Sequence, residues 1–153
     1  MSKPAPLIAA ILALAAAVFG GIWYARRPSS MIRRWLQRRS ADDFLNYMPV
    51  SPDEAQRLKM ATGRDFTGFT HRIDRDAVKH AMKHGKDKRP VTQRDIKQLP
   101  CYILNAQTVR ENARKGKLPT LEYHYTDADG ETLIVEEIRT GWKRLAFKTM
   151  YKK

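Results

Sequence analysis

Hydrophobic and polar positions follow the period of helices in the middle of the chain and the period of strands in its carboxyl half. The run Ser51-Pro-Asp-Glu54 is a capping box with proline at the first helical position, which predicts a helix over residues 52–62. An aspartate caps a second predicted helix over residues 75–84, whose apolar side chains form one stripe. A threonine caps a third, which closes at Pro100.

The carboxyl half switches to a period of two. We expect strands at residues 102–104, 121–125, 133–138 and 144–150, after a short extended run at residues 69–73. The Asp-Gly pair in Asp127-Ala-Asp-Gly130 suits positive backbone angles and predicts a hairpin. Short helices followed by a three- or four-stranded antiparallel sheet predict an α+β domain.

The amino-terminal segment is apolar, because residues 5–25 contain no charged side chain. As a helix, residues 7–24 span about 27 Å, which just covers a bilayer core. Six arginines follow, and positive flanks stay in the cytoplasm, so we expect a single-pass membrane anchor with a cytoplasmic soluble domain. The alternatives are a signal peptide, whose cleavage would leave a secreted protein, and a soluble hydrophobic tail.

The next segment, residues 31–45, reads as a basic amphipathic helix with Ile32, Trp35 and Leu36 on one face. Such a helix beside a membrane span is typical of an interface with anionic lipid, through the basic residues 26–39. The predicted organisation is therefore an anchor or signal segment at 1–27, a juxtamembrane helix and linker at 28–47, and a soluble domain at 48–153.

Charge supports this division and restricts the partners. The chain of 153 residues carries a net charge of +13, and its first 40 residues hold seven cations and no acid. The remainder is basic enough to favour a polyanionic partner. A single cysteine, Cys101, excludes an internal disulfide and a zinc site built from several cysteines.

The end of the chain gathers acids, cations and hydroxyl groups on two predicted strands joined through Thr140-Gly141. They are Glu136, Glu137, Arg139, Lys148, Thr149 and Tyr151. Such groups can hold a phosphate and move a proton beside it, although they are also common on a solvated sheet face. Strand alternation places Arg139 on the face of Glu137 and separates Lys148 from Thr149.

Two histidines, His80 and His84, share one face of the second predicted helix with Asp76. They could serve as an acid–base pair, cap the helix end or bind a metal. The zinc-protease pattern requires a glutamate directly after the first histidine, where this chain has Ala81, so we expect no metal. His71 and His124 lie in extended runs and are interpreted as structural or surface residues.

Three motifs, in this order, resemble the phage-type barnase–EndoU–colicin–RelE-like nuclease domains. They are Val50-Ser-Pro-Asp-Glu-Ala with the run to Asp74, Val78-Lys-His-Ala-Met-Lys-His-Gly85 with Pro90 to Ile96, and Val135-Glu-Glu-Ile-Arg-Thr-Gly141 with Leu145 to Lys152. The resemblance covers residues 50–153. It implies a small nuclease fold of helices packed on an antiparallel sheet, which cleaves RNA without a metal or other cofactor.

The resemblance also implies roles for individual residues. His80 or His84 would be the acid–base imidazole, and Glu136 or Glu137 would orient it or replace it as base. Arg139 and Lys148 would neutralise the phosphate, and Thr149 would donate a hydrogen bond.

The function expected from the sequence is therefore a toxin- or effector-type endoribonuclease that attacks RNA through its 2′-hydroxyl. Its partners would be RNA, with tRNA among the candidates, the membrane, and an acidic immunity protein; the chain itself would be a monomer. Two alternatives remain open. One is a catalytically inactive module of a phage or prophage membrane protein that binds RNA or a partner, and the other is a structural phage membrane protein.

Overall fold

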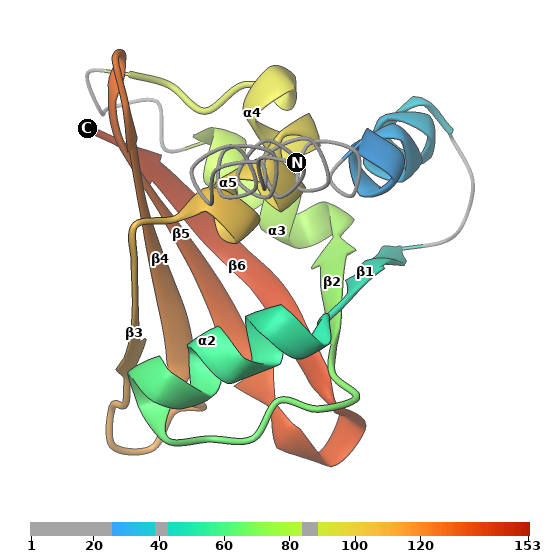
Figure 1. Cartoon of the computed structure of the whole chain (residues 1–153). Coiled ribbons are helices and arrows are strands. Elements are labelled where there is room, and N and C mark those ends of the chain that lie inside the picture. The colour runs from blue at the N-terminus through green and yellow to red at the C-terminus, as the bar shows by residue number, and fades with distance from the viewer. Residues whose placement is uncertain (1–25, 39–42, 84–88) are drawn as a thin grey trace, which may run out of the picture.

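The computed structural model describes residues 26–38, 43–83 and 89–153. A six-stranded mixed sheet forms its centre, with strand order β1-β2-β6-β5-β4-β3 (Figure 1). The strands are β1 (Phe44–Pro49), β2 (Thr70–Asp74), β3 (Thr108–Asn112), β4 (Thr120–Asp127), β5 (Gly130–Arg139) and β6 (Arg144–Lys152). Neighbouring strands pair antiparallel, with the exception of β2 and β6, which are parallel.

Short helices cover the sheet. They are α2 (Pro52–Thr62), α3 (Arg75–Lys83), α4 (Gln93–Lys97) and α5 (Leu99–Asn105), besides a helical segment at residues 26–37 and the 3₁₀ turn η1 (Thr140–Trp142). In Figure 1, α2 crosses the front of the sheet. Helix α2 contacts β3, α5 contacts β4 and β5, and α3 contacts β6. The apolar core lies between α2, α5 and the sheet face that they cover, and includes Leu121, Tyr123 and Ile134.

Several sequence predictions are confirmed with their caps. Helix α2 spans the predicted residues; the Ser51 hydroxyl accepts from the Glu54 backbone N–H at 3.2 Å, and Gly63 ends the helix in the left-handed region at φ 76°. Asp74 caps α3 by accepting from the Ala77 backbone N–H at 2.8 Å. The Asp-Gly hairpin joins β4 to β5, with Asp127 paired to Gly130.

The predicted sheet had too few strands and lacked the parallel strand pair. Six mixed strands replace the expected three or four antiparallel ones, since β1 and β3 were not predicted and the β2–β6 contact is parallel. Residues 102–104, expected as a strand, lie in helix α5. Three apolar residues in a row do not distinguish the two periods. Pro100 does not close a helix but stands in the first turn of α5, where a missing N–H costs nothing.

The predicted juxtamembrane helix over residues 31–45 was also wrong in its extent and its surroundings. The helix covers residues 26–37, and residues 44–49 form strand β1. Ile32 and Trp35, expected to face lipid, are 0% and 5% exposed and belong to the protein core. The Arg75 guanidinium donates to the backbone oxygen of Trp35 at 3.0 Å and lies over its ring. The packed domain therefore includes residues before position 48.

The predicted membrane anchor at residues 5–25 lies outside the described residues. Within residues 26–38, 43–83 and 89–153, no helix is long and apolar enough to cross a bilayer.

Candidate active site on the open face of the sheet

Side chains along strand β5 alternate between the two faces of the sheet. Ile134, Glu136 and Ile138 are at most 1% exposed on the covered face, whereas Glu137 and Arg139 lie partly exposed on the other. The β4 residue Thr120 pairs with Glu137 and extends this second, open face. The sequence prediction that Arg139 shares a face with Glu137 holds, and the two side chains form an ion pair with 2.9 Å between Nε and Oε1.

A bulge in β6 brings two further residues to the open face. Val135 pairs with Thr149 but Glu136 pairs with Phe147, so Lys148 is an extra residue in its strand. The alternation rule predicted that Lys148 and Thr149 would point to opposite faces. That prediction was wrong, because the inserted residue resets the alternation and both side chains line one depression. Bulges of this kind are common beside active sites.

Four of the predicted site residues line a single depression of about 360 Å³. His80 comes from α3, Glu137 and Arg139 from β5, and Lys148 from the bulge of β6. Asp76, one helical turn before His80, lines it too. An imidazole, carboxylates and two cations from three separate elements therefore converge on one hollow.

A second depression of about 310 Å³ adjoins the first and shares Lys148 with it. Its polar lining includes the cations Arg114 and Lys117 and the hydroxyl-bearing residues Thr149 and Tyr151. Thr149 is only 5% exposed, and its Oγ1 has no hydrogen-bond partner within the described part of the chain. A buried hydroxyl without a partner is costly, so this atom is a candidate contact for a bound oxygen.

Two candidates from the sequence remain, His84 and Glu136. His84 lies outside the described residues. Glu136 is fully buried on the covered face and cannot reach the depression. Arg114 and Lys117 were not predicted as site residues, since their only signal is a basic run between two strands. The buried cluster that holds Glu136 was not predicted either.

That cluster consists of His71 between two carboxylates, and all three side chains are buried. The protonated ring donates from Nε2 to Glu54 Oε1 at 2.7 Å and from Nδ1 to Glu136 at 3.0 Å. The Glu54 carboxylate, predicted to close the capping box of α2, is instead turned toward the imidazolium. The cluster joins α2, β2 and β5 inside the core.

Burial lowers the pKa of His71, but the opposing charges of Glu136 and Glu54 prevail and raise it to about 10. Tyr47 stacks on the His71 ring, and burial together with the charges of Glu136 and Glu54 raises the pKa values of both Tyr47 and Tyr123. The cluster is sealed from solvent and on the far side of β5 from Glu137. We therefore assign it to stability rather than to chemistry.

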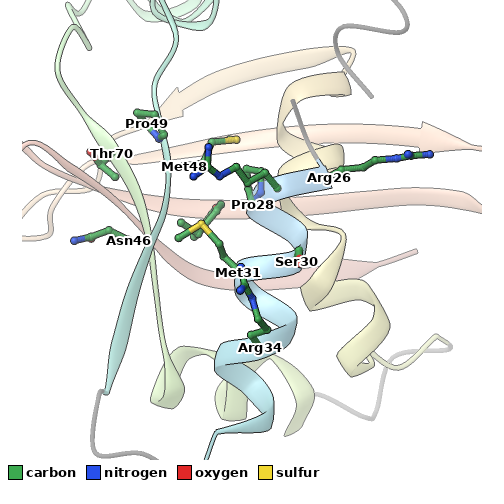
Figure 2. Close-up of a pocket in the computed structure, with 11 residues that line it drawn as sticks. Arg26, Pro28, Ser30, Met31, Arg34, Asn46, Met48, Pro49 and Thr70 are labelled. Atoms are coloured by element: carbon green, nitrogen blue, oxygen red, sulfur yellow. The ribbon is translucent and has the colours of Figure 1, made fainter. Parts of the chain in front are cut away.

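A cavity of about 950 Å³ lies between the helical segment at residues 26–37 and strand β1 (Figure 2). Its lining is mainly apolar with basic residues around it, and includes Arg26, Arg34, Met31, Met48 and Pro49. None of the predicted site residues lines it. The chemistry-bearing groups gather instead on the open face. Among the described residues, no group of three or more His, Cys, Asp or Glu side chains is arranged so that it could hold a metal ion.

A small α+β domain with an imidazole, a carboxylate and cations around one hollow is the type of arrangement that acts on phosphate esters. The family described as phage-Barnase-EndoU-ColicinE5/D-RelE like nuclease3 matches residues 50–153. The chain belongs to this nuclease family, which confirms the resemblance drawn from its motifs. No curated protein and no solved structure gave a significant match.

Proposed function

We propose that this chain is an endoribonuclease that cleaves RNA without a metal, by attack of a ribose 2′-hydroxyl on the adjacent phosphate. The observation that carries the proposal is the shared depression of His80, Glu137, Arg139 and Lys148. Membership of a nuclease family supports a nucleic-acid substrate. We choose RNA because its 2′-hydroxyl supplies the nucleophile. The protein then needs only acid–base groups and cations, which are the groups in this depression.

In the proposed reaction, the Glu137 carboxylate accepts the proton of the 2′-hydroxyl as its oxygen bonds to phosphorus. The bond from phosphorus to the 5′-oxygen breaks, and His80 donates a proton to that leaving oxygen. The products are a 2′,3′-cyclic phosphate and a free 5′-hydroxyl. His80 is exposed on α3 and Glu137 lies on β5, so the two groups approach the substrate from different elements.

Negative charge builds on the phosphate oxygens during the attack. Arg139 and Lys148 are the cations in the same depression, and their charge stabilises this state. Arg139 is already held by Glu137, which fixes its guanidinium beside the proposed base. The buried Thr149 hydroxyl next to Lys148 supplies a further hydrogen bond to a phosphate oxygen.

The test uses the full chain, purified in mild detergent, with total RNA in the presence of EDTA. Wild type should cleave, and His80→Ala and Glu137→Gln should each lose activity by about a hundredfold or more. Glu131→Gln is the matched control, because Glu131 lies on the same face of β5 at its other end and pairs with His124. Intact RNA with wild type, despite salt-dependent binding, would favour the inactive binding module instead.

The cellular setting is part of the same proposal. Residues 5–25 would anchor a cytoplasmic nuclease domain in the membrane, with a cleaved signal peptide as the alternative. A basic nuclease of the toxin type would be held inactive by an acidic immunity protein. Fractionation of cells that express the chain with a carboxyl-terminal tag distinguishes an anchor from a signal peptide. Recovery in the membrane at full mass supports an anchor, and a shortened secreted product supports a signal peptide.

A further inference from the structure

A third depression on the open face carries the feature that the proposed reaction does not use. It is lined by Leu118, Glu137, Arg139, Thr140, Gly141 and Trp142. Glu137 and Arg139 also line the depression of His80, so the two hollows adjoin at the proposed catalytic groups. A ligand whose phosphate lies beside Arg139 therefore extends naturally into this third space.

Two large apolar side chains in this lining, Trp142 and Leu118, are exposed to solvent. Trp142 is 68% exposed and Leu118 is 52% exposed. Single exposed apolar residues are ordinary, but these two come from different loops and meet at one depression beside a cation. Gly141 lies between Trp142 and the catalytic strand, and a Cβ atom there would meet nothing within 4 Å. The space at Gly141 is therefore open, and the side chain of its neighbour Trp142 is exposed.

The backbone beneath Trp142 is fixed although its side chain is exposed. The Arg144 guanidinium donates to the carbonyl oxygen of Trp142 at 3.0 Å. The Thr70 backbone N–H donates to the Lys143 oxygen at 3.1 Å, which ties the η1 turn to strand β2. On the opposite side, the Ile138 N–H donates to the Pro119 oxygen at 2.9 Å and holds the residue after Leu118 against β5. Both apolar side chains thus stand on anchored backbone.

We propose that Trp142 and Leu118 form a nucleobase subsite, which receives an unpaired base next to the phosphate held at Arg139. An exposed indole offers a flat face on which a base stacks, and stacking accepts any base. In a duplex both faces of each base are already covered, so a stacking site selects single-stranded RNA. This inference rests on the proposed function for its phosphate position, and it specifies the substrate class as single-stranded or looped RNA.

Binding is measured with a single-stranded 2′-O-methyl hexanucleotide, which cannot be cleaved by 2′-hydroxyl attack. Its partner probe is a hexamer with the same backbone and no bases. The Trp142→Ala variant of the full chain should bind the base-bearing hexamer about tenfold more weakly or worse, and the abasic hexamer as wild type does. Trp142→Phe should retain most of the affinity, and Leu118→Ser should lose part of it.

Met60→Ala serves as the control, since Met60 is 82% exposed on α2 and does not line the depression. Indole fluorescence gives a direct second signal when the third tryptophan, Trp23, is replaced by Phe in both proteins: the base-bearing hexamer should quench the protein that keeps Trp142 and leave Trp142→Phe unquenched, because Trp35 is 5% exposed. Equal affinity of wild type and Trp142→Ala for the base-bearing hexamer would overturn the subsite. If wild type does not cleave RNA but binds the base-bearing hexamer through Trp142, the result would count against the proposed reaction alone and not against the subsite.

Discussion

Glu136 and Glu137 are neighbours in the chain and lie on opposite faces of strand β5. Glu136 is fully buried and accepts from His71 at 3.0 Å, whereas Glu137 lines the depression of His80 and pairs with Arg139. One carboxylate therefore holds the core together and the next is available for chemistry. The two should be separable by mutation.

Replacing each glutamate by glutamine should give opposite results. Glu136→Gln leaves the buried His71 charge with one carboxylate, and we expect the free energy of unfolding to fall by about 3 kcal/mol. Glu137→Gln changes a partly exposed group and should leave stability within about 0.5 kcal/mol while lowering cleavage by about a hundredfold or more. Urea unfolding and RNA cleavage measured on both variants decide this. A stable, inactive Glu136→Gln protein would reverse the assignment.

Stability should fall as the pH rises above neutrality. The His71 pKa is about 10 in the folded protein and near 6.5 in the unfolded chain. Between these values the folded state holds one more proton, so the free energy of unfolding decreases by about 1.4 kcal/mol per pH unit. Below pH 6.5 both states are protonated and the contribution is complete.

The measurement is urea unfolding of wild type and of the triple variant His71→Gln, Glu54→Gln, Glu136→Gln, which removes all three charges of the cluster, between pH 6 and pH 9.5. The groups that face His71 are Glu54, Glu136, Tyr47 and Tyr123, and burial and the two carboxylate charges raise the tyrosine pKa values above this interval. The slope should be present in wild type and absent from the variant. Equal slopes in both proteins would show that other groups cause it.

Thr149→Val should separate phosphate binding from folding. The Thr149 hydroxyl is buried without a partner, so an isosteric methyl group should leave stability unchanged or raise it slightly. A hydrogen bond to a charged oxygen is worth about 1.5–3 kcal/mol, which predicts a loss of about tenfold to a hundredfold in kcat/KM for RNA. Thr149→Ser, which keeps the hydroxyl, should retain activity. Full activity of the valine variant would remove Thr149 from the site.

A fragment that begins at residue 48 should not fold, even though the family match begins at residue 50. It lacks the buried side chains of Ile32, Trp35 and Tyr47, and it lacks most of strand β1, which pairs with β2. Losing a buried aromatic side chain costs about 3–5 kcal/mol, and several such losses exceed the stability of an ordinary domain. Circular dichroism of residues 26–153 and 48–153 compares them directly. A cooperative thermal transition in the shorter fragment would contradict the packing described for residues 26–49.

Local signals in the sequence predicted much of the fold. The two helix caps, Ser51 and Asp74, and the Asp-Gly turn act through hydrogen bonds to nearby backbone. Their effects can therefore be predicted from the local sequence alone. The β1 strand was not predicted, because its first residues, Phe44 and Leu45, were assigned to the end of the helix expected over residues 31–45. The parallel contact of β2 with β6 joins segments about seventy residues apart and leaves no local trace.

The candidate site was partly predictable for the same reason. Glu137 and Arg139 share a face through simple alternation, but the Lys148 bulge depends on the register of two whole strands. The choice between Glu136 and Glu137 depended on which face the helices cover. His71, interpreted only as structural or surface, became informative once Glu54 and Glu136 were seen on either side of it.

The central claim is that the substrate's own 2′-hydroxyl is the nucleophile. The most direct measurement incubates the full chain in EDTA with a single-stranded DNA oligonucleotide that contains one ribonucleotide, and determines the product masses. The proposed mechanism predicts one cut, directly 3′ of the ribonucleotide, which leaves a 2′,3′-cyclic phosphate and a 5′-hydroxyl, and no cut in the all-DNA or 2′-O-methyl version. Cleavage of all three oligonucleotides, or of none while RNA binding persists, would contradict it.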